Sequence, residues 1–160
     1  MNKFYLFFIS VSLLFFSACS SKSALNYFKS DPQSAMAIQY TKKSDLIYKN
    51  DINAVIFSTY LNKINSKYEN GKLDSFIIGT HLVNKNNHDF IANGYKIFLN
   101  DKLFKSIKGL DKQSDLVKSI PLKNNWANYY IIHFNRDKNR ELILKLIHPI
   151  YGQTQVKFQK

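Results

Sequence analysis

Residues 126–134 read WANYYIIHF, and this stretch decides the fold class. Aromatic and β-branched residues favour extended strands, in which successive side chains point to opposite faces. We therefore expect a strand whose inward face carries Tyr130, Ile132 and Phe134. Apolar side chains alternate in the same way over residues 142–147, so a second strand is expected there, after a polar loop.

The same period of two continues upstream of this stretch. Residues 76–83 carry apolar side chains on both faces, which is typical of a central strand, and residues 95–100 predict a half-buried strand. Residues 52–64 are also apolar on both faces. A helix is the alternative for them, but their Val, Ile, Phe, Thr and Tyr residues favour a strand. The middle of the chain therefore adds three strands.

The domain is expected to begin with a strand at residues 35–41, which continues at 46–48 after a polar break at 42–45. Turns are expected at Asn50-Asp51 and at Asn70-Gly71, because Asn and Gly accept the backbone angles of tight turns. These turns separate the strands into hairpins.

Polar segments divide the second half of the chain in a similar way. A loop is expected at residues 84–87, a turn at 100–102, and a short helical turn over 111–118 that Asp111 would cap. Residues 153–158, after Pro149 and Gly152, predict a final hairpin strand or a bulged edge strand.

Short strands at intervals of about ten residues indicate an all-β fold, a single antiparallel β-sandwich of about 7 to 9 strands over residues 35–160. This pattern resembles the immunoglobulin-like or transthyretin-like domains of small bacterial lipoproteins. The resemblance implies an immunoglobulin-like variant with Trp126 as a core tryptophan. Since the chain has a single cysteine, it has no disulfide pair of the antibody type.

The N-terminal segment has the features of an export signal. Lys3 supplies a positive charge, residues 4–16 are apolar apart from two serines, and Ser17-Ala18 offers small side chains for cleavage. A helix that spans a membrane needs about 20 apolar residues, and this run is too short. We therefore expect residues 1–18 to be removed.

Phe16-Ser17-Ala18-Cys19 resembles the lipobox of bacterial lipoproteins, although the family pattern usually has Leu where Phe16 stands. The resemblance implies that signal peptidase II cuts between Ala18 and Cys19. Cys19 would then carry a diacylglyceryl group and a further fatty acid such as palmitate, and two or three such chains hold a protein firmly at a membrane. Lipidation also explains a solitary cysteine in an exported chain.

The resemblance also predicts where the protein resides. In enteric bacteria an Asp after the lipidated cysteine retains a lipoprotein in the inner membrane, and this chain has Ser20 there. We therefore expect an outer-membrane lipoprotein that faces the periplasm. Residues 19–34, which are small and polar, would be the lipidated cysteine and its tether. Removal of residues 1–18 from the 160-residue chain leaves 142 residues, enough for one domain.

The chain is strongly basic, with a formal charge of +12 that falls to +11 when Lys3 is removed with the signal. An anionic partner is one interpretation of this charge, and a solvated surface is the other. Arg136 and Arg140 are the only arginines, and the lysines are scattered along the chain. Nucleic-acid readers favour the planar guanidinium group, so we expect no nucleic-acid partner.

The sequence contains no local signature of an enzyme. Neither G-x-S-x-G nor S-x-x-K occurs, no second cysteine is present, and the glycines are isolated, so no phosphate-binding loop is formed. We therefore expect no enzymatic activity, no catalytic residues and no cofactor. The four histidines have no metal-ligand spacing, so no metal is expected, although His133 and His148 lie in neighbouring predicted strands where they could approach one another.

Aromatic residues are the remaining candidates for binding. Trp126, Tyr129, Tyr130 and Tyr151 could form a partner-binding surface, because Tyr and Trp offer large contact areas at low entropic cost. Packing in the core of the sandwich is the alternative for the same side chains. The choice between them depends on which of these residues the fold buries.

Three functional hypotheses follow. The first is a non-enzymatic envelope lipoprotein that binds a protein partner, or itself, through a strand edge or an aromatic face, for instance as an accessory lipoprotein of a secretion or surface machine. The second is a carrier or sensor of an anionic envelope ligand such as lipopolysaccharide, which would gather lysines on one face. The third is a hydrolase whose site is assembled from distant residues.

Overall fold

Two antiparallel β-sheets form the part of the chain that the computed structural model describes, residues 32–69 and 71–160. Contacts divide the chain into two units, Met1–Pro32 and Gln33–Lys160, and the second unit contains both sheets. The proposed signal peptide and the lipobox with Cys19 lie outside the described residues. Within those residues, no helix is long and apolar enough to cross a membrane.

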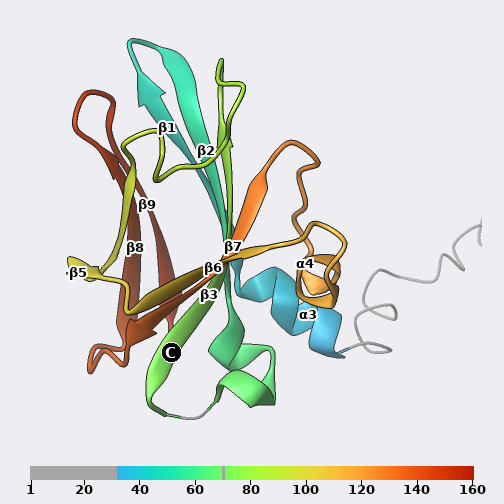
Figure 1. Ribbon diagram of the computed structural model, residues 1–160. Helices are drawn as coiled ribbons and strands as arrows, with labels where there is room; N and C mark the ends of the chain where they lie inside the picture. Colours follow the sequence, from blue (N-terminus) through green and yellow to red (C-terminus); the bar gives the residue numbers. More distant parts are fainter. Residues whose placement is uncertain (1–31, 70) are drawn as a thin grey trace, which may run out of the picture. The chain divides into compact units, whose positions relative to one another are not determined.

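Sheet A has five strands, which are, in spatial order, β1 (Thr41–Tyr48), β2 (Asp51–Tyr60), β3 (Leu73–Leu82), β7 (Asn128–Asn135) and β6 (Ser106–Leu110). All of its pairs are antiparallel. The apolar stretches that indicated strands from the sequence thus supply β2, β3 and β7, and the segment predicted as a central strand is the middle strand of the sheet (Figure 1).

Sheet B has four strands, in the order β5 (Lys102–Leu103), β4 (Lys96–Leu99), β8 (Glu141–His148) and β9 (Gly152–Gln159). Sheet B packs against one face of sheet A (Figure 1). The prediction of an all-β, antiparallel sandwich of 7 to 9 strands is confirmed.

Short helices lie between the strands. They are α3 (Pro32–Gln39), the 3-10 helices η2 (Leu61–Lys63) and η3 (Ser66–Tyr68), and α4 (Asp115–Ser119). Both α3 and α4 lie on the side of sheet A that faces away from β8 and β9 (Figure 1). Sheet A is therefore covered on both faces, by sheet B and by helices.

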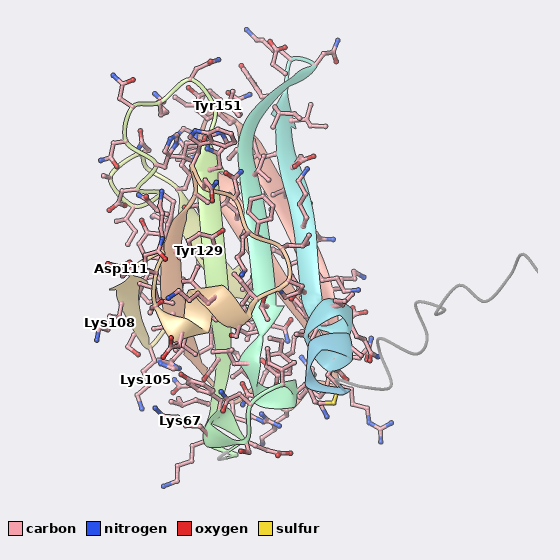
Figure 2. All side chains as sticks on the ribbon, turned by 90° about the vertical axis from the view of Figure 1, so that its right-hand side faces the viewer. Lys67, Lys105, Lys108, Asp111, Tyr129 and Tyr151 are labelled. Atoms are coloured by element: carbon pink, nitrogen blue, oxygen red, sulfur yellow. The ribbon has the colours of Figure 1, made fainter. Side chains whose placement is uncertain are left out.

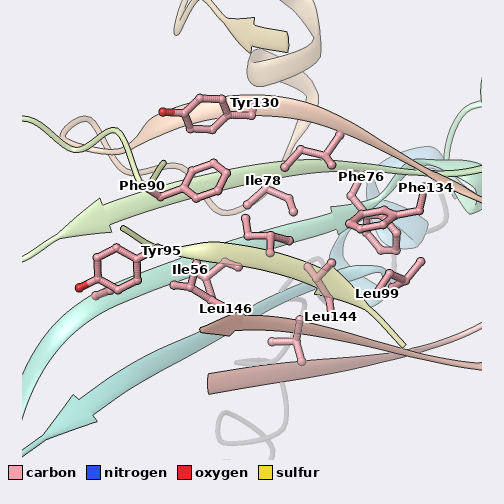
Figure 3. Packing of buried hydrophobic residues seen from close by; sticks show 14 of the residues in the cluster. Ile56, Phe76, Ile78, Phe90, Tyr95, Leu99, Tyr130, Phe134, Leu144 and Leu146 are labelled. Atoms are coloured by element: carbon pink, nitrogen blue, oxygen red, sulfur yellow. The ribbon is translucent and has the colours of Figure 1, made fainter. Parts of the chain in front are cut away.

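The main core lies between the two sheets (Figure 3). Tyr130, Ile132 and Phe134 of β7 point into it as predicted, and Leu144 and Leu146 of β8 meet them from sheet B. Successive side chains of a strand point to opposite faces, so β7 and β8 can each present a row of apolar side chains to this core.

A second, smaller core lies on the outer face of sheet A. Ala37 of α3 and Val117 of α4 pack there against Ile77, Tyr129 and Ile131 of the sheet. This second core explains why the strands of sheet A are apolar on both faces. It also explains why a short helix such as α4 is stable, since tertiary packing rather than intrinsic propensity holds a helix of this length.

The two sheets meet along one flank of the sandwich. β1, the outer strand of sheet A, lies beside β9, the outer strand of sheet B. A hydrogen bond of 2.5 Å joins the hydroxyl groups of Ser44 and Thr154 across this flank. On the opposite flank the chain crosses from β5 to β6 through Phe104 and Lys105. The edges of β1 and β9 therefore shield each other.

A fully buried carboxylate joins the C-terminus to sheet A. Asp74 of β3 accepts hydrogen bonds from the Tyr60 hydroxyl at 2.8 Å, the Arg136 guanidinium at 3.0 Å and the Asp137 backbone N–H at 2.8 Å. Its second oxygen also lies 3.2 Å from the ammonium of Lys160. Each buried lone pair is thus used, which is the condition under which a buried charge is tolerated.

Neighbouring groups of this network titrate outside their usual ranges. Burial, together with the Asp74 carboxylate, raises the pKa of Tyr60, so its hydroxyl stays protonated and donates to Asp74. The backbone N–H of Asn139, with Lys102, holds the pKa of the Asp137 carboxyl below its usual value. Both effects favour the protonation states that the hydrogen bonds require.

The first predicted strand is wrong over residues 35–39, which belong to helix α3. Pro32 suits the first helical position, and the Ala, Met and Gln residues that follow are good helix formers. The predicted polar break at 42–45 is also wrong, because these residues belong to β1. The side chains of Lys42 and Lys43 are exposed, so polar residues are accepted in this outer strand.

Several predicted turns are placed correctly, and others shift by a residue or more. The first hairpin turns at Lys49 and Asn50, which have φ of 52° and 68°, rather than at Asn50-Asp51. Gly71 has φ of 70°, as its turn requires, whereas Asn70 lies outside the described residues. The strand predicted over 52–64 ends at Tyr60, where η2 follows.

The predicted helical turn exists as α4, but its cap is different. The Ser114 hydroxyl, and not Asp111, accepts the Val117 N–H at the start of this helix. Asp111 instead accepts the Gln113 N–H at 2.7 Å and closes the turn before the cap. Asp and Ser can each cap a helix or close a turn, so the sequence alone did not show which of the two residues is the cap.

Candidate binding surface

β6 forms an open edge of the sandwich. Among the described residues it pairs with β7 on one side and has no strand on the other. Ser106, Lys108 and Gly109 are exposed, and a Cβ atom added to Gly109 would meet nothing within 4 Å. An edge of this kind leaves backbone N–H and C=O groups available to another chain.

Lysines follow this edge. Lys105 and Lys108 project outward at the margin of the sheet, as Figure 2 shows. Neither side chain has an ion-pair or hydrogen-bond partner among the described residues, whereas Lys102 is paired with Asp137. The edge of β6 is therefore electropositive, with charges that nothing in the described sandwich neutralises.

Two adjoining pockets open where β6 ends. The first has a volume of about 380 Å³, the second about 350 Å³, and Lys112 and Tyr129 line both. The first pocket is lined by Gly109, Leu110, Asp111, Lys112, Asn128, Tyr129 and Tyr130. The second, which we call the amide pocket, is lined by Lys112, Gln113, Val117, Lys123, Asn124, Asn125 and Tyr129.

Tyr129 holds the wall of these pockets in place. Its hydroxyl accepts the Asn124 N–H at 2.7 Å and donates to the Asn124 carbonyl at 3.2 Å, so the ring ties β7 to the loop that follows α4. The ring lies across Gly79 of β3, where a Cβ atom would come within 2.6 Å of Tyr129 Cε1. Only glycine leaves room for this arrangement.

The four aromatic residues predicted to form a binding surface do not share one face. Tyr129 is 3% exposed and lies in the outer core, while Tyr130 is 8% exposed and lies in the core between the sheets. Tyr151 is half-buried beside Tyr48. Trp126 is 69% exposed, so the prediction that it is a core tryptophan is wrong.

A partner-binding role for these four residues stays a prediction, and the four residues lie at separate places in the fold. Trp126 and Tyr129 lie next to the pockets, since Asn124 bonds to both of them. Tyr151 stacks on His148 with ring centres 4.3 Å apart, in a separate aromatic cluster with Tyr95.

The histidines are not arranged as the sequence suggested. His133 lies in sheet A and His148 in sheet B, so the expectation that they occupy neighbouring strands is wrong. His81 and His88 form the closest pair, with ring centres 4.6 Å apart. Within the described residues no group of three or more His, Cys, Asp or Glu side chains could hold a metal ion.

Ser75 and His133 make a serine–histidine contact of 2.8 Å. The His133 ring stacks on Tyr68, and among the described residues no carboxylate orients it. Ser75 is also 2% exposed, so a substrate in solvent cannot reach its hydroxyl. The contact has the properties of a structural hydrogen bond rather than those of a nucleophile with its base.

Two half-buried histidines make the stability of the fold depend on pH. Burial lowers the pKa of His133 below its usual 6.5, and burial together with the nearby His88 lowers the pKa of His81. A histidine with a lowered pKa takes up its proton more readily in the unfolded chain. We therefore expect the free energy of unfolding to fall as the pH drops below about 6.5, before the carboxylates titrate.

Urea unfolding at a series of pH values between about 5 and 8 measures this dependence. The His133→Gln variant keeps a hydrogen-bonding group beside Ser75 but cannot titrate, so its free energy of unfolding should fall less steeply with acidity. A wild-type stability that is constant from neutral pH to about pH 5 would contradict the prediction.

No family model matches the chain, and neither a curated protein nor a solved structure matches it. The function is therefore inferred from the geometry of the described residues.

Sequence reasoning missed β6 and the lysines around it. Ser106-Ile107-Lys108-Gly109-Leu110 has one β-branched residue and a glycine, so its pattern does not indicate a strand. Lys112 and Lys123 are eleven residues apart, and only the return of the chain after α4 brings both to one pocket. The signal available in the sequence was the cluster of Lys and Asn at 123–125.

Proposed function

We propose that the chain is a non-enzymatic lipoprotein of the bacterial envelope, anchored through Cys19, whose sandwich binds an extended, acidic segment of a partner protein at β6. The anchor is supported by the lipobox-like residues 16–19. The binding role is supported by the open edge of β6, which is the observation that carries the proposal.

β6 is better suited to accept a strand than the other outer strands. β1 and β9 lie beside each other, and β5 is two residues long. β6 offers five residues, and an added strand of that length could use the backbone groups that are unpaired within the described chain. Strand addition gives affinity through the main chain and specificity through side chains, and a flat five-residue edge suits this mode.

The charge of the edge indicates the chemistry of the partner. Lys105 and Lys108 have no acidic partner among the described residues. Complementary charges speed association and exclude partners of the same sign. An acidic extended segment fits this edge better than a second copy of the chain, whose own β6 would place lysines opposite lysines.

Photo-crosslinking in intact cells tests the proposal. A photoreactive residue at position 106, an exposed position of β6, should capture a partner protein, and Lys108→Glu in the same full-length protein should abolish its recovery. Lys96 provides the matched control, because it is an exposed lysine on β4, in the other sheet. Lys96→Glu makes the same change of charge and should leave recovery unchanged.

Hydrogen exchange distinguishes strand addition from contact through side chains alone. Amide groups of residues 106–110 should gain protection when the captured partner is added to the purified protein. Capture without such protection would contradict strand addition. Capture of a second copy of this chain, or equal loss with Lys96→Glu, would contradict an acidic partner at β6.

A further inference from the structure

The lining of the amide pocket carries positive charge only. It contains two lysines and no carboxylate. The Lys112 ammonium donates to the Asn125 carbonyl at 2.6 Å, so its charge is fixed at the rim. Lys123 has no partner among the described residues. A concave site with one sign of charge concentrates ligands of the opposite sign, so an anionic group is favoured.

The other lining groups are suited to hydroxyl groups. Gln113, Asn124 and Asn125 each bring a side-chain amide, which both donates and accepts hydrogen bonds. Asn124 uses its Oδ1 for the Trp126 N–H at 2.8 Å, which fixes this side chain. The Val117 and Tyr129 side chains add apolar surface to the same pocket. A pocket lined by both amide groups and apolar side chains suits a ligand with many hydroxyl groups on a carbon ring.

An exposed tryptophan adjoins the rim of the pocket. Trp126 directly follows the lining residue Asn125, and its ring stacks on no other aromatic ring of the described chain. An indole left 69% exposed is unusual without a ligand or partner, because large aromatic side chains concentrate at binding sites. The C–H face of a sugar ring is one surface that such an indole covers.

We propose that the amide pocket binds an acidic saccharide, with its carboxylate or phosphate between Lys112 and Lys123 and its hydroxyl groups on the amides. A volume of about 350 Å³ lies at the lower end of the range for small-molecule sites and accommodates one or two sugar rings. The site is separate from strand addition: it uses side chains beyond the end of β6 and no edge backbone.

Calorimetric titration of the purified full-length protein tests this inference. Galacturonic acid oligomers or glucose 6-phosphate should bind, and the tighter of the two shows whether a carboxylate or a phosphate is the preferred charged group. Neutral galactose oligomers should bind much more weakly. A tri-glutamate peptide serves as the acidic peptide probe. Added salt should weaken the binding of the acidic sugars, since a screened charge carries part of it.

Lys123→Gln should weaken binding of the acidic sugar by about ten-fold or more, because a charge-assisted hydrogen bond is lost. Lys118→Gln is the matched control, since Lys118 is an exposed lysine of α4 whose ammonium has no partner among the described residues and which lies outside the pocket lining. Trp126→Ala should weaken sugar binding and leave the fold intact, as its ring is largely exposed.

Several results would overturn the inference. They are the absence of binding of either acidic sugar at millimolar concentrations, equal binding of the neutral sugar, tighter binding of the tri-glutamate peptide, and an equal loss with Lys118→Gln. Lys108→Glu, which should abolish strand addition, should leave the sugar titration unchanged. The two proposals therefore fail separately.

Discussion

Asp74→Ala should destabilise the fold by about 3–5 kcal/mol, the usual cost when one member of a buried ionic network is removed. The Asp74 carboxylate accepts from Tyr60, Arg136 and the Asp137 backbone, and Lys160 lies beside it. Alanine would leave these donors without their acceptor. Tyr60 would be affected most, because it is fully buried and water cannot easily replace the carboxylate, whereas the Lys160 ammonium keeps its hydrogen bond to the Asp137 carbonyl.

Urea unfolding of the full-length protein measures this effect, and Glu141→Ala is the matched control. Glu141 also pairs with a lysine, Lys157 at 3.3 Å, but 43% of its side chain is exposed. Removal of such a pair should cost no more than about 1 kcal/mol. If the two variants lose the same small amount of stability, the Asp74 network does not contribute as described.

Cys19→Ala should abolish fatty-acid labelling of the protein in cells. The expected effect is complete, because the thiol is the only atom in the chain that can carry a thioether-linked lipid. The protein should then be released from the membrane fraction or accumulate with its signal uncleaved. Radiolabelled or clickable palmitate followed by immunoprecipitation measures the labelling, and cell fractionation measures the location.

Ser20→Ala and Ser21→Ala provide the controls for this change. They alter small residues directly after the cysteine and should leave labelling intact. Labelling that persists in the Cys19→Ala variant would contradict the anchor. It would leave the proposed binding at β6 unaffected, because that proposal depends on the sandwich and not on the lipid.

Segments that are buried on at least one face were predictable from the sequence. β7 and β8 were both correctly predicted as strands, and the inward face predicted for β7, with Tyr130, Ile132 and Phe134, is the one that enters the main core. β3 was recognised as central because it is apolar on both faces. Such patterns are reliable because a slip of one residue would turn the apolar face to water.

Segments at the edges of the sheets were less predictable. The polar start of β1 and the whole of β6 are stabilised by pairing with a neighbouring strand. Their side chains show little of the apolar pattern that would indicate a strand. The helix at 32–39 depends on contacts of Ala37 with the outer core. In β1 and β6 distant parts of the chain override local preference, and in the helix they add to it.

The candidate surface was predicted in part. Tyr129 and Trp126 were among the aromatic residues singled out, but their different burial could not be read from adjacent positions in one strand and its preceding loop. An open strand edge was expected as a route for binding, but the sequence did not indicate which strand forms it. Lys112 and Lys123 were indistinguishable from the other lysines until the chain folds back.

The order of strands in sheet A also determines how the protein would respond to mechanical force. β1 follows the N-terminal segment, and β6 is the outer strand at the opposite side of the same sheet. If the N-terminus is held at a membrane and a partner pulls on β6, tension enters at Thr41 and crosses every hydrogen-bonded ladder of sheet A in turn. Sheet B lies outside this hydrogen-bonded path, so the β8–β9 ladder would carry less of the load than the β6–β7 and β1–β2 ladders.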